Sequence, residues 1–289
     1  MRTAAIALVA LFAAVQPAPY RAEIEAFQKH RASEIGGRTG WAALAGLHWL
    51  TPGTHTIGRA KTNDVVLLAP SSPSQLGTLT VTDTGVTLAM APRVRATLKG
   101  APVTTAELRP NSSAANGLVV GGMTMVVIKR GPKLALRVWD SESAGAKHFT
   151  GLTWHPIDTA WRIDAKFIAH TPVPTVKIMN VLGEVVNMRN PGVAEFTVGG
   201  QTHRLEALLE GSDADELFFM FRDATSKKTT YAAGRYLYTP LPKDGRVVLD
   251  FNKAKNPPCA FTDFATCPLP PPRNRLTIGV TAGELFRGH

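Results

Sequence analysis

Residues 77–90 read GTLTVTDTGVTLAM, and this stretch carries the pattern that decides the fold. Val, Thr and Leu favour extended backbone, whereas Asp and Gly favour a turn between two short runs. Similar runs recur at roughly ten-residue spacing, separated by Gly, Asp or Pro. They occupy residues 53–68, 94–103, 121–131 and 134–140. This rhythm predicts a mainly β protein with a sandwich or small barrel in its N-terminal half.

Four parts follow from the pattern along the chain. We expect a signal peptide at 1–19, a helix and an apolar connector at 20–50, and a β-sandwich at 51–140. A C-terminal β domain at 141–289 then carries a polar cleft and a proline-rich loop at 253–274. The helix is predicted over 21–35, where Ile24, Phe27 and Ile35 stand among charged residues, and two glycines end it.

The N-terminus has the composition of a secretory signal. Arg2 precedes an apolar run at 4–15, which is too short to span a bilayer and is followed by small residues and prolines. An uncleaved anchor is the alternative. No later stretch reaches the roughly 18 apolar residues that a membrane helix needs. The sequence therefore predicts a periplasmic or secreted protein with no integral membrane segment after signal removal.

Charge and motifs narrow the classes of function. The net charge is +10, but the basic residues are scattered, which favours a solvated surface over a nucleic-acid interface and leaves anionic ligands as partners. The chain has no GxGxxG, P-loop, GxSxG or HExxH motif, so we predict no cofactor. The oligomeric state stays open.

Both cysteines lie in NPPCAFTDFATCPLPPPRNRL, residues 256–276, in which six residues are proline. An even cysteine count in an exported protein favours a disulfide between Cys259 and Cys267. Free thiols are the next alternative. A metal site is the weakest one, because no Cys or His partner lies at the usual ligand spacing, and we predict none.

Polar residues cluster around this loop. An expected hairpin with strands at 217–221 and 229–238, and the next strand, VVLDFN, end in charged and amide side chains that we expect to share one cleft. The predicted ligand-binding residues are Arg222, Asp223, Tyr231, Arg235, Asn252, Asn256, Asn274 and Arg275. The predicted catalytic residues are Asp250 and Glu284. In the alternative interpretation, the arginines pair with the carboxylates in a buried network that fastens the loop.

The segment TIGRAKTNDVVL, residues 56–67, resembles the opening of forkhead-associated domains, which are phosphothreonine-binding β-sandwiches. The similarity rests on Gly58-Arg59 and Asn63-Asp64. It departs at SSPSQLGTL, where those domains carry a Ser-Arg-x-His segment with phosphate contacts. The resemblance implies a sandwich scaffold, in which Arg59 alone could bind an anion.

A second resemblance runs over nearly the whole mature chain, roughly residues 25 to 285. It rests on FRDATSKKTTYAAGRYL (221–237) and DFNKAKNPPCAFTDFATCPLPPPRNRL (250–276), with GLHWL upstream and AGE downstream. These strings are similar to those of the domain-of-unknown-function 1684 family, which often has GK where this chain has KK. The resemblance implies that the cysteine loop belongs to a shared design, and it implies no catalytic residue.

Three functions follow from these features. The first is recognition of a small polar or anionic ligand in the C-terminal cleft. The second is a hydrolase in which Asp250 or Glu284 acts as general base and arginines stabilise developing negative charge. The third is a protein-interaction module that uses a β edge or the proline-rich loop.

Overall fold

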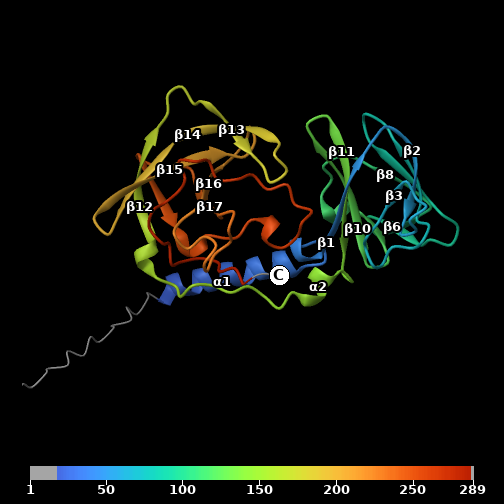
Figure 1. Ribbon diagram of the computed structural model, residues 1–289, viewed down its shortest axis with the longest axis horizontal. Coiled ribbons are helices and arrows are strands. Elements are labelled where there is room, and N and C mark those ends of the chain that lie inside the picture. Colours follow the sequence, from blue (N-terminus) through green and yellow to red (C-terminus); the bar gives the residue numbers. More distant parts are fainter. Residues whose placement is uncertain (1–17, 288–289) are drawn as a thin grey trace, which may run out of the picture.

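The computed structural model describes residues 18–287 and confirms a mainly β protein with one helix near its N-terminus. Two lobes lie side by side, the N-terminal lobe in blue to green and the C-terminal lobe in yellow to red (Figure 1). The predicted signal lies outside the described residues, apart from Ala18 and Pro19, which begin α1. Within the described range, no helix is both long and apolar enough to cross a membrane.

The helices and short helical turns are α1 (Ala18–Gly36), η1 (Trp41–Ala43), η2 (Ala114–Asn116), α2 (Ala144–His148), η3 (Thr159–Trp161), η4 (Phe251–Lys253) and η5 (Pro258–Ala260). The N-terminal lobe contains the strands β1 (Leu44–Leu50), β2 (Gly53–Gly58), β3 (Val65–Val66), β4 (Gly77–Val81), β5 (Val86–Met90), β6 (Ala96–Leu98), β7 (Ala101–Val103), β8 (Thr105–Leu108), β9 (Leu118–Val120), β10 (Met123–Arg130) and β11 (Lys133–Asp140). The C-terminal lobe contains β12 (Arg162–Ala169), β13 (Thr175–Met179), β14 (Val185–Val198), β15 (Gln201–Leu209), β16 (Glu216–Phe221), β17 (Arg235–Pro240) and β18 (Arg246–Asp250).

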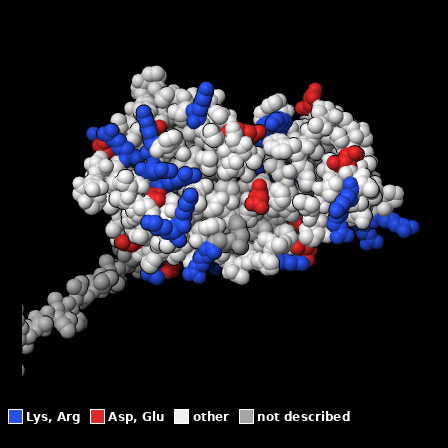
Figure 2. Space-filling model, viewed as in Figure 1, with Lys and Arg blue, Asp and Glu red and all other residues white. Residues whose placement is uncertain are grey.

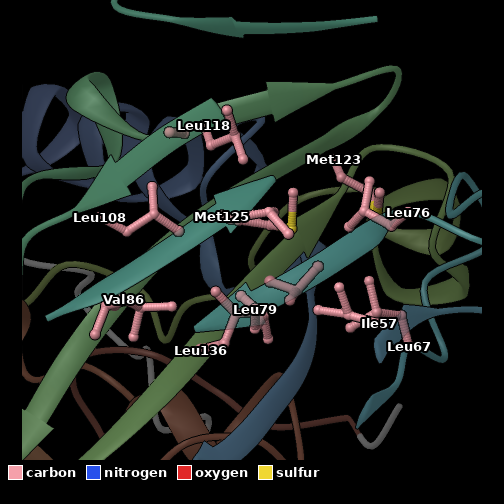
Figure 3. Close-up of a cluster of buried hydrophobic side chains, with 14 of the residues drawn as sticks. Ile57, Leu67, Leu76, Leu79, Val86, Leu108, Leu118, Met123, Met125 and Leu136 are labelled. Carbon is pink, nitrogen blue, oxygen red and sulfur yellow. The ribbon is translucent and has the colours of Figure 1, made fainter. Parts of the chain in front are cut away.

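The N-terminal lobe is a sandwich of two sheets, with strand orders β1-β11-β10-β9-β6-β7 and β3-β2-β4-β5-β8. The opening stretch forms the β4–β5 hairpin, in which Leu79 lies opposite Leu88. Both side chains point into one core with Met125 and Leu136 of the other sheet (Figure 3). Period-two alternation on facing strands therefore produces the predicted sandwich.

Strand β10 is buried on both faces, from Met123 to Ile128. Met125 and Val127 face the sandwich core, while Val126 and Ile128 belong to a second cluster that includes part of the proline-rich loop through Phe264. The outer face of this sheet is thus an interface between the lobes, which explains why the strand shows a continuous apolar run instead of alternation.

The C-terminal lobe is built on one antiparallel sheet in the order β17-β16-β15-β14-β12-β18, with β13 paired to β14. Thr239 on one edge strand donates a 2.9 Å hydrogen bond to the Val248 carbonyl on the other. The sheet therefore curls towards closure around an apolar core that includes Phe219, Phe221 and Phe251.

Helix α1 ties the two lobes together (Figure 1). Near its start, the Tyr20 hydroxyl donates to Asp250 Oδ1 at 2.9 Å. Just after its end, Arg38 donates to the Gly121 carbonyl of the N-terminal lobe at 2.8 Å. Ile24 and Ile35, both predicted on the apolar face, are buried.

Two local predictions are wrong in detail. The return strand of the hairpin begins at Arg235 and not at 229, because the Asp223 carboxylate accepts from the backbone and hydroxyl of Thr225 and holds the chain in turns. Residue Asn252 lies in η4 and not in a strand, because Asp250 Oδ1 accepts from its backbone N–H and caps that turn.

Charged side chains are spread over both lobes on the face shown in Figure 2, with more Lys and Arg over the C-terminal lobe. In the N-terminal lobe, Arg59 is exposed, while Asn63 is buried and donates to the carbonyls of Ala60 and Ser74. Asp64 accepts from the backbone and hydroxyl of Thr56. The Asn-Asp pair therefore braces the β2–β3 loop.

Candidate functional site

Arg235 and Asp223 form a buried ion pair at 2.6 Å, with both side chains 1% exposed. Arg235 also donates to the carbonyls of Ala282 and Val280. This one contact belongs to the fastening network that the sequence allowed as an alternative. Neither residue lines a cavity of the molecule that we identify below.

Asp250 and Asn252 bind the protein itself. The Asn252 amide donates to the Asp158 carbonyl at 2.7 Å and to the Tyr20 hydroxyl at 2.9 Å, and that hydroxyl donates in turn to Asp250. Burial raises the pKa of Tyr20, and its hydrogen bond to Asp250 adds to the effect. The pair therefore holds the first turns of α1 against the C-terminal lobe.

The remaining predicted binding residues are dispersed. The Asn274 side chain is fully buried and bonds to the backbone of Glu206 and Met220. Arg222 donates to the Ala233 carbonyl, and Arg275 is exposed. Tyr231 donates to the Cys259 carbonyl at 2.9 Å, which anchors the proline-rich loop. As binding residues, all of them stay predictions.

Asn256 and Glu284 do come together, around an arginine that the sequence analysis did not include. The Asn256 backbone and amide donate to the two Glu284 carboxylate oxygens at 3.1 and 2.9 Å. Arg31 of α1 donates to the Asn256 carbonyl at 2.9 Å, and its Nε lies 3.8 Å from Glu284 Oε2. Helix α1 is thus clamped to both ends of the proline-rich region by one buried cation.

Burial raises the pKa of the Glu284 carboxyl to about 7, against the opposing influence of the Arg31 charge and the Asn256 hydrogen bonds. Its ordinary value is 4.5. Desolvation is therefore the stronger effect, and this carboxyl changes charge near neutral pH.

The predicted Cys259–Cys267 disulfide is not present, and both cysteines are free. The η5 turn directs the Cys259 N–H at Cys267 Sγ, with a nitrogen–sulfur distance of 3.1 Å. Hydrogen bonds from Tyr231 to the Cys259 carbonyl and from Tyr236 to the Pro268 carbonyl hold the loop on either side. Packing and hydrogen bonds therefore order this loop without a covalent link.

Two cavities lie beside the Arg31–Asn256–Glu284 cluster. The larger measures about 790 Å³ and is lined by α2, the chain after it, the proline-rich loop and Glu284. The other measures about 480 Å³ and lies between the lobes. We call it the basic cavity; four of its lining side chains are basic, namely Arg31, Arg130, Arg137 and Lys255, and two are acidic, namely Glu34 and Glu210. Asn256 borders both cavities.

Arg137 enters the basic cavity from β11. Residues alternate along this strand, so Leu136 and Val138 face the sandwich core while Arg137 faces the C-terminal lobe. Its guanidinium lies 5.3 Å from the ring centre of Trp41 and 5.8 Å from that of Trp139. Burial lowers the pKa of Arg137 to about 10, with a further contribution from the Arg130 charge. The aromatic rings fix a half-buried cation that has no carboxylate partner among residues 18–287.

Lys255 enters from the opposite wall. Its backbone pairs with Tyr236, and its ammonium lies 4.6 Å from the Tyr238 ring centre. Burial lowers the pKa of Lys255, and the nearby Arg31 charge adds to the shift. Over the part of the chain that the structure describes, this ammonium has no ion pair. It is therefore a second desolvated cation that the protein does not neutralise.

Polar atoms at the same place lack hydrogen bonds. Within the described residues, Arg31 Nε, Arg137 Nε and Asn256 Oδ1 are buried and make none. Each such atom costs roughly 1–3 kcal/mol when it has no partner. All three residues line the basic cavity, so the cost is concentrated at one place.

The sequence did contain signals for the residues that were missed. Arg31 follows Ile24 by seven positions and precedes Ile35 by four, so it lies on the apolar face of α1. Arg137 interrupts LALRVWD at a position that shares a strand face with the buried Ala135 and Trp139. A charge on the buried face of a helix or strand indicates a pairing partner or a ligand.

Residues 147–285 match the model of a family described as a protein of unknown function, DUF1684. This part of the chain belongs to that family. The DUF1684 region includes the proline-rich loop, Lys255 and Glu284, whereas Arg31 and Arg137 lie before it. The predicted match over residues 25 to 285 is thus shown for the C-terminal part only.

A solved structure of an uncharacterized protein from Haloarcula marismortui is 32% identical to this chain. The alignment covers 48% of this chain and 78% of that protein, with a TM-score of 0.42. The curated proteins gave no match.

Replacing Glu284 by Gln should remove a pH dependence of stability. Folding raises the pKa of this carboxyl, so folding favours its protonated form. The resulting stabilisation is complete below pH 4.5 and is lost as the pH rises through about 7. At pH 8 the Glu284→Gln variant should be more stable than the unmodified protein by an amount on the order of 3 kcal/mol, relative to the difference at pH 4.5.

Urea unfolding of both proteins between these pH values measures the change. Glu107→Gln, at an exposed position on β8, is the matched control and should follow the unmodified protein. Parallel pH profiles for Glu284→Gln and the unmodified protein would contradict the assignment.

Proposed function

We propose that this protein recognises a small anionic ligand in the basic cavity between its two lobes. One observation carries the proposal: Arg137 and Lys255 are half-buried cations on opposite walls, and neither has a carboxylate partner within the described chain. A buried cation without a counterion costs several kcal/mol, and an anionic ligand would offset that cost. Arginine and lysine are also the side chains that bind carboxylate and phosphate groups best.

The electrostatics of the cavity support the same choice. Glu34 lies 3.5 Å from Arg31, and Glu210 accepts a hydrogen bond from the Tyr238 hydroxyl, so both acids already have partners. Arg130 adds a further cation at the rim, and its guanidinium donates only to its neighbour's carbonyl. The potential in the cavity is therefore positive, and a ligand would meet preformed donors.

The aromatic rings contribute specificity. Trp41, Tyr236 and Tyr238 line the cavity, and Tyr238 stacks on Phe218 with ring centres 4.7 Å apart. Rigid rings hold the two cations in place, so little side-chain entropy is lost when a ligand binds. The site suits a compact anion that is partly desolvated.

Replacing Lys255 by Gln should weaken anion binding about tenfold, because a hydrogen bond to a charged group contributes roughly 1.5–3 kcal/mol. Isothermal titration calorimetry with inorganic phosphate, citrate and benzoate at low ionic strength measures the change. Lys61→Gln removes the same charge from an exposed loop and should leave affinity unchanged. If none of the three anions binds saturably, or if both variants bind alike, the proposal is wrong.

A hydrolase is the second candidate, favoured by Glu284. This carboxyl lines the larger cavity, and its pKa of about 7 suits a general base at neutral pH. It ranks below ligand binding because Asn256 already occupies both of its oxygens. Asp250 lines neither cavity.

Hydrolysis predicts turnover of at least one substrate in a panel of p-nitrophenyl esters, phosphates and glycosides. Glu284→Gln should lower that turnover by roughly 10²-fold or more. Turnover that survives the substitution, or none with any substrate, rejects Glu284 as the base.

A further inference from the structure

The rim of the basic cavity is apolar, although the cavity itself is charged. Val181 and Leu182, in the turn between β13 and β14, are 39% and 50% exposed, and Trp49 at the end of β1 is 40% exposed. Met179, Val185 and Val186 of the same hairpin are exposed as well. Six large apolar side chains on one rim exceed the scattered exposure that is normal for a surface.

The hairpin is attached directly to the cavity wall. The Val181 N–H donates to the Cys267 carbonyl at 2.9 Å, and Asn180 forms a bridge with Pro268. Cys267 and Pro268 both line the basic cavity. The side chains of the hairpin turn therefore begin where the wall of the cavity ends.

Trp49 approaches from the other lobe. The Lys133 ammonium lies 5.6 Å from the Trp49 ring centre and 3.4 Å from Glu184 of the hairpin turn. Lys133 is paired in register with Arg130, which lines the cavity. The turn of the β13–β14 hairpin and the end of β11 thus face each other across the gap between the lobes (Figure 1).

A ligand that satisfies both features has two chemically different parts. The cations of the cavity need a negative group, and the rim offers apolar surface that water covers at a cost. A small hydrophilic anion would use only the cavity and leave the rim exposed.

We propose that the ligand is an anionic amphiphile, with its charged head between Arg137 and Lys255 and its apolar chain over Val181, Leu182 and Trp49. This inference rests on the proposed function and specifies the class of its ligand. The uncompensated charge of the cavity selects a monomeric anion as the occupant, because a neutral apolar segment would leave Arg137 and Lys255 unpaired.

The test is calorimetric titration of the full chain with inorganic phosphate and with methyl, butyl, octyl and decyl phosphate, each below its micelle concentration. Affinity should rise with chain length, by up to about fourfold for each methylene that the rim covers. The double variant Val181→Ser/Leu182→Ser should lose at least tenfold in affinity for decyl phosphate and keep its affinity for inorganic phosphate. Leu241→Ser, which alters a comparably exposed leucine after β17, should change neither affinity.

The outcomes separate the two proposals. If phosphate binds but affinity does not depend on chain length, the amphiphile is rejected and the anion site stands. If neither phosphate nor any alkyl phosphate binds, both fail. If decyl phosphate binds equally well to the double serine variant, or if the protein binds only anionic vesicles and no monomer, the assigned rim is wrong.

Discussion

A guanidinium buried between a helix and a loop is the interaction on which the rest of this structure depends. Arg31 of α1 donates to the Asn256 carbonyl and lies beside the Glu284 carboxylate. Its position fixes the helix against the proline-rich loop, and the loop in turn packs Phe264 onto the outer face of the N-terminal sandwich. Removing one member of such a cluster leaves a buried charge unpaired, which costs far more than the loss of a surface ion pair.

This arrangement explains why the polar cavity lies between the lobes. The outer face of β10 and β11 is apolar except for the cations Arg130, Lys133 and Arg137. The C-terminal lobe covers that face with aromatic rings and with Lys255, so basic groups from two lobes meet with few acids between them. The ordered loop needs no disulfide, because hydrogen bonds from Tyr231 and Tyr236 already hold it on both sides of the cysteines.

The β-rich fold, the sandwich and the helix near the N-terminus could be predicted, because each is written in local periodicity. Of the predicted site, Asn256 and Glu284 do line cavities. Arg235 and Asn274 are instead engaged with backbone inside the C-terminal lobe, and their spacing along the chain could not distinguish the two roles. Arg31, Arg137 and Lys255 were beyond local reasoning, because residues far apart in sequence form one cavity only after the two lobes pack together.

The central claim is that Arg137 and Lys255 together form an anion site. Its most direct measurement is an anomalous difference map from a crystal soaked in selenate, a tetrahedral dianion with a strong X-ray signal. The account predicts a selenium peak between the Arg137 guanidinium and the Lys255 ammonium, within hydrogen-bonding distance of both. Selenium peaks confined to other surfaces, with none between these two side chains, would contradict it.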